Sequence, residues 1–365
     1  MLDLLAIFVP AVLVCLFLKF YWKDQITNTE SYISLGVNLG ISLLLVGTLA
    51  LVQQMKMYDT EVWSGVVTGK ERNRVSCEHS YSCNCYTSCS GSGKTRSCTR
   101  HCSTCYDHSY DIDWNVYTTL GTYDIDRIDR QGLKEPPRWT IVQKGEYVTD
   151  KRSYKNPLLA DEKTLFVELP EMKQTGYYYP KYPEIYDYWK ISRVSGIVGP
   201  LRNQLNDIIN ERLKYMGPNK QINVVLVGTT VTDPKYFNGL MADWRGGKKN
   251  DVILVYGLDS SNAIKWFRSN SYAMGMGNKE LHHRLLLNVD KKTLSVQHLE
   301  EQIKLVERHF KRLSTEEIKF KAMAVDTPLW AVLLLSVLNL ITSLLIGKYM
   351  RDNEVSFSNK RGRKW

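Results

Sequence analysis

Three apolar runs interrupt the hydrophobic pattern of this chain, and a long polar body lies between the second and the third. Residues 34–54 contain no charged side chain. As a helix, this run is long enough to cross the hydrocarbon core of a bilayer, which is roughly 30 Å thick. A core helix of a globular protein would show a polar face somewhere over that length. The pattern therefore predicts a transmembrane helix at residues 32–55.

The first apolar run, residues 4–18, is shorter. Its start carries an acidic residue in place of the positive charge of a signal peptide, and no small-x-small cleavage site follows. Lys19 can extend its amine to the headgroups, while Tyr21 and Trp22 suit the membrane interface. We therefore interpret residues 1–23 as a retained first transmembrane helix.

The third apolar run, residues 328–346, predicts a transmembrane helix at residues 327–350. Asn339 is its most polar interior residue, and we expect its amide to bond to a neighbouring helix. Small side chains also share one face of the second span, where another helix or a second copy of the chain could approach closely. These residues are Gly36, Gly40 and Gly47.

The first part of the polar body shows strand-like alternation. Residues 61–71 predict one strand, and residues 108–129 predict two more that are joined by a turn at 120–122. We therefore predict a small antiparallel β unit at residues 56–175, whose first hairpin carries a cysteine-rich insertion at residues 77–108. In this alternation, apolar and polar side chains point to opposite faces of the strand. The apolar set is Ile112, Trp114 and Val116, and the polar set is Asp111, Asp113 and Asn115.

A segment rich in tyrosine and proline, residues 176–197, follows the β unit. Prolines at this density favour an extended chain that packs along a surface. We interpret it as a structural linker. The alternative is an aromatic strip that binds sugars or headgroups.

The next unit, residues 198–290, mixes helical patterns with fully apolar strands. An amphipathic helix at residues 201–216 is expected to end at Gly217-Pro218. Apolar strands of this kind occur in sheets that are covered on both faces, so we predict a three-layer α/β sandwich. The later elements are a strand at 222–228, a helix at 234–244 and strands at 252–257 and 263–268.

Residues 295–326 predict amphipathic juxtamembrane helices. The first of them carries an apolar stripe that we expect to pack on its own domain. Ser314 and Glu317 have the spacing of a capping box, which would start a further helix. The stripe consists of Leu299, Ile303, Val306, Phe310 and Leu313.

Charge sets the expected orientation. The chain has 365 residues and a net charge of +10, part of which lies in a basic tail at residues 351–365. By the positive-inside rule this tail lies in the cytoplasm, where it meets anionic headgroups. With three spans, the N-terminus and the central body then lie outside the cytoplasm. The other basic residues are scattered, so we expect membrane lipid and no nucleic acid as a partner.

Eight cysteines are unevenly distributed, with Cys15 in the first apolar run and seven in the insertion. In an oxidising compartment a loop poor in apolar residues needs disulfides, and three would leave one thiol over. Alternatively, seven thiolates and one imidazole would complete two tetrahedral zinc sites. The predicted location favours disulfides and the odd cysteine count favours zinc, with a structural role either way. The residues concerned are Cys77, Cys83, Cys85, Cys89, Cys98, Cys102, Cys105 and His108.

Other candidate chemistry is weaker. Carboxylates gather on one face of the β hairpin, where they could hold a hard cation such as calcium, although solvated strands alternate in the same way. His282 and His283 are adjacent on a predicted helix, and we expect both on the surface. No Ser/His/Asp or Cys/His set stands out in the sequence as a nucleophilic constellation. The carboxylates are Asp111, Asp113, Asp124 and Asp126.

The α/β unit resembles the TPM domain, a family of extracytoplasmic, membrane-anchored modules with photosystem-repair and reported phosphatase members. The resemblance covers residues 198–289 and rests on the helix at 201–216, on INVVLVG, on Trp244-x-Gly246 and on NDVILVYG. It implies the fold of that family. The family has an Asp-Asn-Gly turn before its second strand, whereas this chain has Lys249-Asn250-Asp251, so the resemblance does not extend to cation binding or phosphatase activity.

These patterns predict an α+β membrane-anchored protein with three transmembrane helices, a cysteine-rich antiparallel β unit and a TPM-like α/β sandwich. The function they favour is an extracytoplasmic scaffold or binding domain that joins other membrane or envelope proteins, without catalysis. The alternative is a cation-dependent, phosphatase-like hydrolase, which would require Asp233, Asp243 and Asp251 to converge at one strand end. Three short spans supply too few polar residues for transport.

Overall fold

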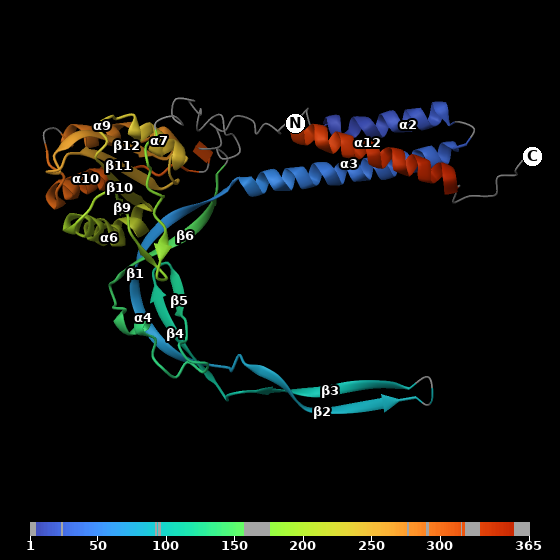
Figure 1. The fold of residues 1–365 in the computed structure, drawn as a ribbon, viewed down its shortest axis with the longest axis horizontal. Helices are drawn as coiled ribbons and strands as arrows, with labels where there is room; N and C mark the ends of the chain where they lie inside the picture. Colours follow the sequence, from blue (N-terminus) through green and yellow to red (C-terminus); the bar gives the residue numbers. More distant parts are fainter. Residues whose placement is uncertain are drawn as a thin grey trace, which may run out of the picture. The chain divides into compact units, whose positions relative to one another are not determined.

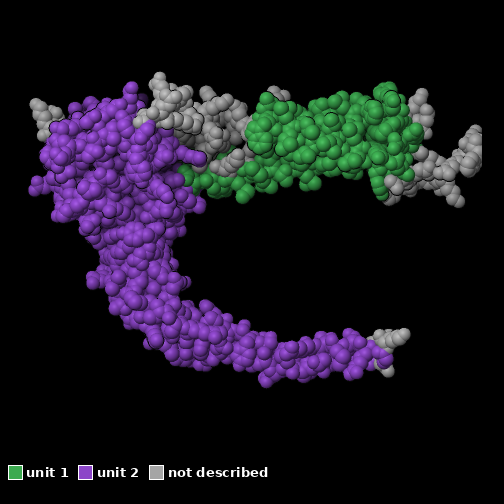
Figure 2. Space-filling view, in the orientation of Figure 1, with its two compact units in different colours: residues 1–59, 155–167, 314–365 green, residues 60–154, 168–313 purple. Residues whose placement is uncertain are grey.

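The computed structural model describes residues 5–22, 25–91, 93, 96–156, 176–275, 277–289, 292–314, 316–317 and 329–353. The end of the predicted β unit, the entry to the third apolar run and most of the basic tail lie outside the described residues. The chain divides into two compact units, which Figure 2 shows in different colours. Unit 1 comprises Met1–Asp59, Lys155–Val167 and Ser314–Trp365, and unit 2 comprises Thr60–Tyr154 and Glu168–Leu313.

Unit 1 is a bundle of three apolar helices, each of which packs against the other two (Figure 1). The helix α3 and the helix α12 are each long and apolar enough to cross a membrane, whereas the apolar stretch Ala6–Tyr21 is shorter. A capping box formed by Thr27 and Glu30 starts α3. The elements are η1 (Ala6–Phe8), α2 (Val9–Tyr21), α3 (Asn28–Lys56) and α12 (Leu329–Asn353).

The bundle buries a few polar side chains among apolar ones, and the outside is apolar. Asn339 is fully buried, and its Nδ2 donates to the carbonyl of Ile7 at 2.5 Å and to Ser42 Oγ at 2.8 Å. The prediction that Asn339 bonds to a neighbouring helix is confirmed. By contrast, the outward-facing Leu43 and Leu44 are 65% and 70% exposed. The outer face of a soluble helix bundle is polar instead, because it meets water.

The predicted glycine face of α3 does not contact the other two helices. A Cβ atom built at Gly36, Gly40 or Gly47 meets no atom within 4 Å. The side of α3 that packs inside the bundle instead carries Ser34 and Asn38, both buried. Contact between the glycine face and a second copy of the chain stays a prediction.

The first sheet of unit 2 has the strand order β5-β4-β1-β6. Trp114, Val116 and Val148 lie in its core together with Trp189 from a later segment. The antiparallel pair β1–β4 is interrupted by a long second hairpin, β2–β3, as the sequence predicted. The elements are β1 (Tyr58–Val75), β2 (Ser80–Ser90), β3 (Ser97–Tyr106), β4 (Asp111–Thr118), β5 (Gly121–Ile125), α4 (Pro137–Ile141) and β6 (Tyr147–Lys155).

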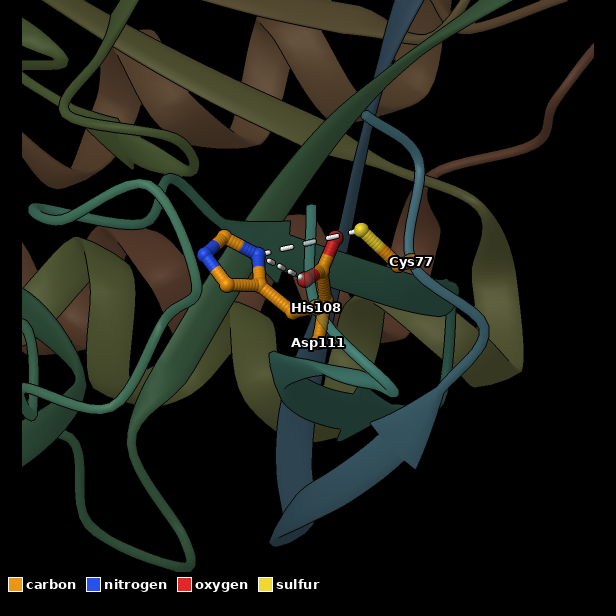
Figure 3. Close-up of side chains that lie close together, drawn as sticks. All are labelled: Cys77, His108 and Asp111. Carbon is orange, nitrogen blue, oxygen red and sulfur yellow. Dashed lines mark hydrogen bonds and ion pairs between the residues drawn. The ribbon is translucent and has the colours of Figure 1, made fainter. Parts of the chain in front are cut away.

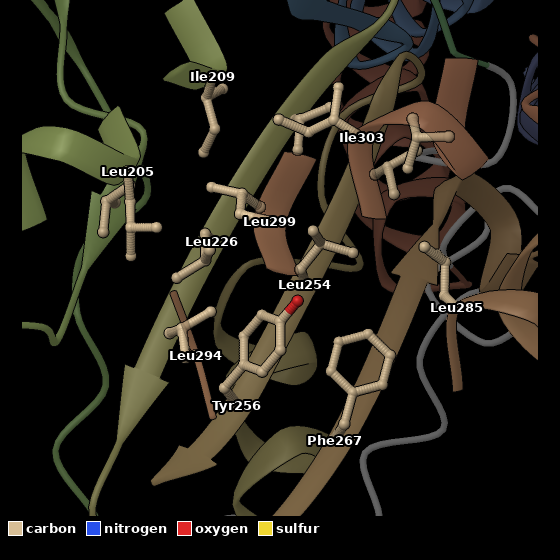
Figure 4. Packing of buried hydrophobic residues seen from close by; sticks show 14 of the residues in the cluster. Leu205, Ile209, Leu226, Leu254, Tyr256, Phe267, Leu285, Leu294, Leu299 and Ile303 are labelled. Atoms are coloured by element: carbon tan, nitrogen blue, oxygen red, sulfur yellow. The ribbon is translucent and has the colours of Figure 1, made fainter. Parts of the chain in front are cut away.

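The second sheet has the order β12-β11-β10-β9, with β9, β10 and β11 parallel and β12 antiparallel. Side chains such as Leu226 and Leu254 face α6, α9 and α10 (Figure 4), whereas Val225 and Val255 face α7. Cover on both faces explains why these strands are apolar at every position. The elements are β9 (Val194–Ser195), α6 (Pro200–Lys220), β10 (Asn223–Thr229), α7 (Tyr236–Asp243), β11 (Asp251–Leu258), β12 (Ile264–Ser271), α8 (Tyr272–Gly275), α9 (Lys279–Asn288) and α10 (Val296–His309).

The first part of the tyrosine- and proline-rich segment packs on this sheet, beside α7. Tyr177, Tyr179 and Tyr182 join the apolar cluster there, and Trp244 Nε1 donates to the carbonyl of Pro180 at 2.8 Å. The segment then forms the short hairpin β7 (Ile185–Tyr186) and β8 (Lys190–Ile191). Tyr177, Tyr179 and Tyr182 thus serve as packing groups, whereas Tyr178 and Tyr186 are exposed, and the role of the segment as a linker stays a prediction.

The end of α6 differs from the prediction. The helix continues through Gly217-Pro218 to Lys220, and Gln221 then adopts a left-handed conformation with φ of 52°. Pro218 lies in the last turn, so it removes one intrahelical hydrogen bond near an end where few remain. Gly217 has a packing role, because a Cβ atom there would lie 2.6 Å from the carbonyl oxygen of Ser64.

The apolar stripe of α10 packs on its own domain, as predicted, because Leu299, Ile303 and Val306 belong to the core cluster of the second sheet. The predicted capping box is also present. The Ser314 amide donates to Glu317 Oε2 at 2.8 Å, and the Glu317 amide donates to Ser314 Oγ at 3.1 Å.

Candidate metal centre and disulfide hairpin

Three disulfides cross-link the β2–β3 hairpin. They join Cys83 to Cys105, Cys85 to Cys102 and Cys89 to Cys98. Cys89 and Cys98 lie directly opposite each other in the strand register. Nearly all the side chains of both strands are exposed or half-exposed, so the hairpin has no apolar core of its own. An isolated two-stranded hairpin is only marginally stable in water. The disulfides supply the stability that packing does not.

Of the two alternatives for this insertion, disulfides or zinc, the structure contains the disulfides. The arrangement with two zinc ions would need these six sulfurs as free thiolates, and here they are paired with each other. Cys77 is the thiol left over, and its side chain is buried. A metal ion at this insertion would have to use Cys77 and donors other than the paired cysteines.

Cys77 lies beside two other potential ligands (Figure 3). Its Sγ is 3.7 Å from His108 Nδ1, and the same nitrogen is 3.4 Å from Asp111 Oδ1. The three ligand atoms all lie within 4.8 Å of one another. In the part of the chain that the structure describes, this is the one group of three or more such side chains that converge in this way.

The site is assembled where the hairpin leaves and re-enters the first sheet. Cys77 follows the end of β1, and Asp111 is the first residue of β4, directly opposite Val75 in the β1–β4 register. His108 precedes β4 in the connection from the hairpin. The antiparallel pairing therefore brings together residues that are more than thirty positions apart in sequence.

Asp111 is held firmly on one side only. Its side chain is fully buried, and its Oδ2 accepts the amide of Glu78 at 3.0 Å and Arg127 Nη1 at 3.1 Å. These donors, the Glu78 amide first, hold the pKa of Asp111 below its ordinary value against the opposing effect of burial. Among the described residues, none makes a hydrogen bond to its Oδ1.

Arg127 organises the acidic groups around the site. Besides Asp111, its guanidinium contacts Asp113 Oδ1 at 2.5 Å and Glu78 Oε2 at 3.4 Å. One cation thus faces three carboxylates. The four carboxylates of the predicted calcium set do not gather around one point. Asp111 and Asp113 both contact Arg127, whereas Asp126 accepts the Tyr188 hydroxyl at 2.9 Å. Asp124 lies exposed on β5, opposite Asn115.

The three side chains do not form a nucleophilic relay. In a Cys–His–acid triad the thiol and the orienting carboxylate contact opposite nitrogens of the imidazole. Here Cys77 and Asp111 both approach Nδ1 of His108. Thiol, imidazole and carboxylate aimed at one point are instead the donor types of a metal site.

The carboxylates that a hydrolase would require lie apart. Asp251 starts β11, is fully buried and accepts the Tyr182 hydroxyl, and its burial raises its pKa to about 6. Asp233 follows β10 and accepts the amide of Lys235 at 2.8 Å. Because β10 and β11 are parallel, these two residues lie at opposite edges of the sheet. Asp243 is exposed at the last residue of α7.

The prediction that His282 is a surface residue is wrong. Its Nδ1 lies 2.8 Å from Ser269 Oγ and its Nε2 lies 2.9 Å from Ser271 Oγ, and burial lowers its pKa to about 4. Adjacent His283 is exposed, as predicted. The two serines are two residues apart on β12, so their side chains lie on the same face of the strand. This spacing was the available signal that one imidazole could contact both.

Comparison of this chain with family models, with curated proteins and with solved structures finds no match. The resemblance of the α/β unit to the TPM domain therefore stays a prediction.

Proposed function

We propose that this chain is an integral membrane protein whose unit 2 lies outside the cytoplasm and serves as a scaffold or binding module for other membrane or envelope proteins. The observation that carries the proposal is the β2–β3 hairpin, in which three disulfides stabilise a ribbon of exposed side chains. The side chains of both strands are exposed or half-exposed, so they are available for contact with a partner.

Membrane insertion is supported by the side chains on the outside of unit 1. Leu334, Val337 and Leu345 of α12 are more than half exposed, as are Leu43 and Leu44 of α3. Burying an aliphatic side chain of this size stabilises by roughly 1.5–3 kcal/mol. A bilayer supplies that burial for every outward residue at once, and water does not. The shorter stretch Ala6–Tyr21 would form the third crossing, with Lys19 reaching the headgroups.

The compartment is supported by the cysteine pairing. Disulfides persist in oxidising compartments and are rare in a reducing cytosol. The basic tail follows α12, so the positive-inside rule favours a cytoplasmic C-terminus. With three crossings, a cytoplasmic C-terminus puts unit 2 outside the cytoplasm. The disulfides favour the same side of the membrane.

A binding role is supported by the aromatic residues of the hairpin. Tyr81, Tyr86 and Tyr106 are each more than half exposed, and the ring of Tyr86 stacks on His101 at 5.3 Å between ring centroids. Exposed tyrosines on a rigid backbone lose little conformational entropy on binding, and tyrosine is enriched in protein interfaces. The separation of Asp233 and Asp251 to opposite sheet edges also favours a binding role over a hydrolase.

Thiol labelling of intact cells tests this proposal. We expect a membrane-impermeant maleimide to label the hairpin cysteines only after an impermeant reductant has been added, and to the same extent as in lysed cells. The Cys15→Ser variant removes the thiol of α2 and is the matched control. Labelling that requires lysis but no reductant would contradict both the disulfides and the compartment.

A further inference from the structure

We propose that Cys77, His108 and Asp111 bind one zinc ion, or another divalent metal of similar preference, at the base of the disulfide hairpin, with a fourth position open to water or to a partner's side chain. This inference does not depend on the membrane orientation proposed above. It concerns donor atoms that lie within unit 2.

The distances match the edges of a tetrahedral zinc site. With zinc–sulfur bonds near 2.3 Å and zinc–nitrogen and zinc–oxygen bonds near 2.0 Å, the sulfur and nitrogen ligands lie roughly 3.6 Å apart, and the nitrogen and oxygen ligands roughly 3.3 Å apart. The observed separations are 3.7 Å from Cys77 Sγ to His108 Nδ1 and 3.4 Å from His108 Nδ1 to Asp111 Oδ1. Two of the three separations thus match a tetrahedral site, and the three ligand atoms all lie within 4.8 Å of one another.

Hydrogen bonds account less well for the same arrangement. The separation of 3.4 Å between His108 Nδ1 and Asp111 Oδ1 exceeds the usual range of N–H···O bonds. A single ring nitrogen carries either one proton or one lone pair, so it serves one neighbour at a time, and the Cys77 thiol also lies 3.7 Å from the carbonyl oxygen of His79, to which it can donate. Asp111 Oδ1 is buried and, in the part of the chain that the structure describes, accepts no hydrogen bond, so it is left facing the point where the ion would lie.

The local charge favours a dication. Around the site, Asp111, Asp113 and Glu78 supply three negative charges, and Arg127 supplies the positive charge that pairs with them. Carboxylates thus outnumber this cation, and a ligating Cys77 thiolate would add one more negative charge, so a divalent ion would lower the local excess of negative charge. A thiolate and an imidazole select zinc-like metals, whereas calcium and magnesium prefer oxygen ligands throughout.

Groups behind the site already orient one ligand. The amide of Glu78 and the guanidinium of Arg127 both bind Asp111 Oδ2, which leaves Oδ1 directed at His108. Outer hydrogen bonds of this kind are a regular part of protein metal sites. The ion would join the end of β1 to the start of β4 and so brace the base of the hairpin. It would also hold Cys77 as a ligand, beside six cysteines that are oxidised in pairs.

Metal analysis of the full-length, untagged protein in detergent tests the proposal. After incubation with zinc chloride and removal of free metal, we expect one zinc ion per chain. With cobalt chloride in place of zinc, we expect an absorption band from thiolate-to-cobalt charge transfer. The Cys77→Ser variant should lose the band, and Asp111→Asn should weaken zinc binding by about 100-fold or more.

Two matched variants control for other cysteines and histidines. Cys15→Ser and His101→Gln should bind zinc as the wild type does, because neither residue contacts the site. Peptide mapping without reductant shows whether each variant keeps its three disulfides, and only variants that keep them are compared. Absence of zinc from the wild type, or a zinc content unchanged by Cys77→Ser, would overturn the proposal.

Discussion

Arg193 donates from Nη2 to Ser64 Oγ at 2.7 Å, and through this bond the second sheet of unit 2 is joined to β1 of the first. The guanidinium is fully buried, and desolvation lowers its pKa to about 10. It also donates from Nε to Asn223 Oδ1 at 2.8 Å and from Nη1 to Asn210. A charge in this position is tolerated because several oxygens around it accept hydrogen bonds from the guanidinium.

Removal of this guanidinium should destabilise unit 2 strongly. In Arg193→Ala, the acceptors on Ser64, Asn210 and Asn223 lose their donor inside the protein. We expect the free energy of unfolding to fall by about 3–5 kcal/mol, measured by denaturant titration in detergent. Arg212→Ala is the control, because Arg212 makes a partly exposed ion pair with Glu300 and should matter by less than about 1 kcal/mol. Equal effects of the two substitutions would refute this account.

Asn339 should stabilise the helix bundle of unit 1. Asn339→Leu removes the bonds to Ile7 and Ser42, and we expect a loss of about 0.6–1.7 kcal/mol, measured by SDS-induced unfolding in mixed micelles. Thr48→Val is the control, because the Thr48 hydroxyl bonds only to the carbonyl of Leu45 in its own helix. A more stable Asn339→Leu protein would show that the buried amide serves something other than stability.

Asp251 should make stability depend on pH in the acid range. Because burial raises its pKa to about 6 from an ordinary value of 3.8, the folded state binds a proton more readily than the unfolded state. Its contribution is therefore fully present below pH 3.8 and is lost as the pH rises through 6. We expect the stability of the wild type relative to Asp251→Asn to decrease by about 2.4 kcal/mol from pH 4 to pH 7. A difference that is constant over this range would disprove the assignment.

Reduction should expose the hairpin to proteases before the rest of unit 2. Arg100 lies on β3 with its side chain exposed, between the cysteines of two disulfides. We expect trypsin to cleave after Arg100 within minutes once a reductant is added, while the two sheets stay folded. Limited proteolysis with mass spectrometry measures this, and the unreduced protein is the control. Equal cleavage in both samples would mean that the disulfides do not order the ribbon.

Much of the fold follows from local patterns. The alternation of Ile112, Trp114 and Val116 predicted β4 and its core, and the uninterrupted apolar runs predicted that β10 and β11 are covered on both faces. The end of α6 was mispredicted because the reason for Gly217 is a long-range one, the close approach of Ser64.

The candidate metal site was only partly accessible from the sequence. Cys77 and His108 were assigned to a zinc set, but Asp111 was assigned to a calcium set, because the alternation of β4 placed it on a solvated face. In the structure Asp111 is fully buried and forms an ion pair with Arg127. One signal was available in the sequence. Residues 77 and 108 are the two ends of an insertion in a hairpin, and antiparallel pairing brings the ends of such an insertion together.

The ladder of disulfides in β2–β3 also determines how the hairpin responds to mechanical load. In an ordinary two-stranded ribbon, a pull that separates the strands breaks hydrogen bonds one after another, starting at the end that is pulled. Here the pair Cys89–Cys98 lies one register position from the pair Ser90–Ser97, so a covalent bond resists almost at once. A partner attached near that end would transmit tension to Cys83–Cys105 and the base of the hairpin without lengthening the ribbon between them.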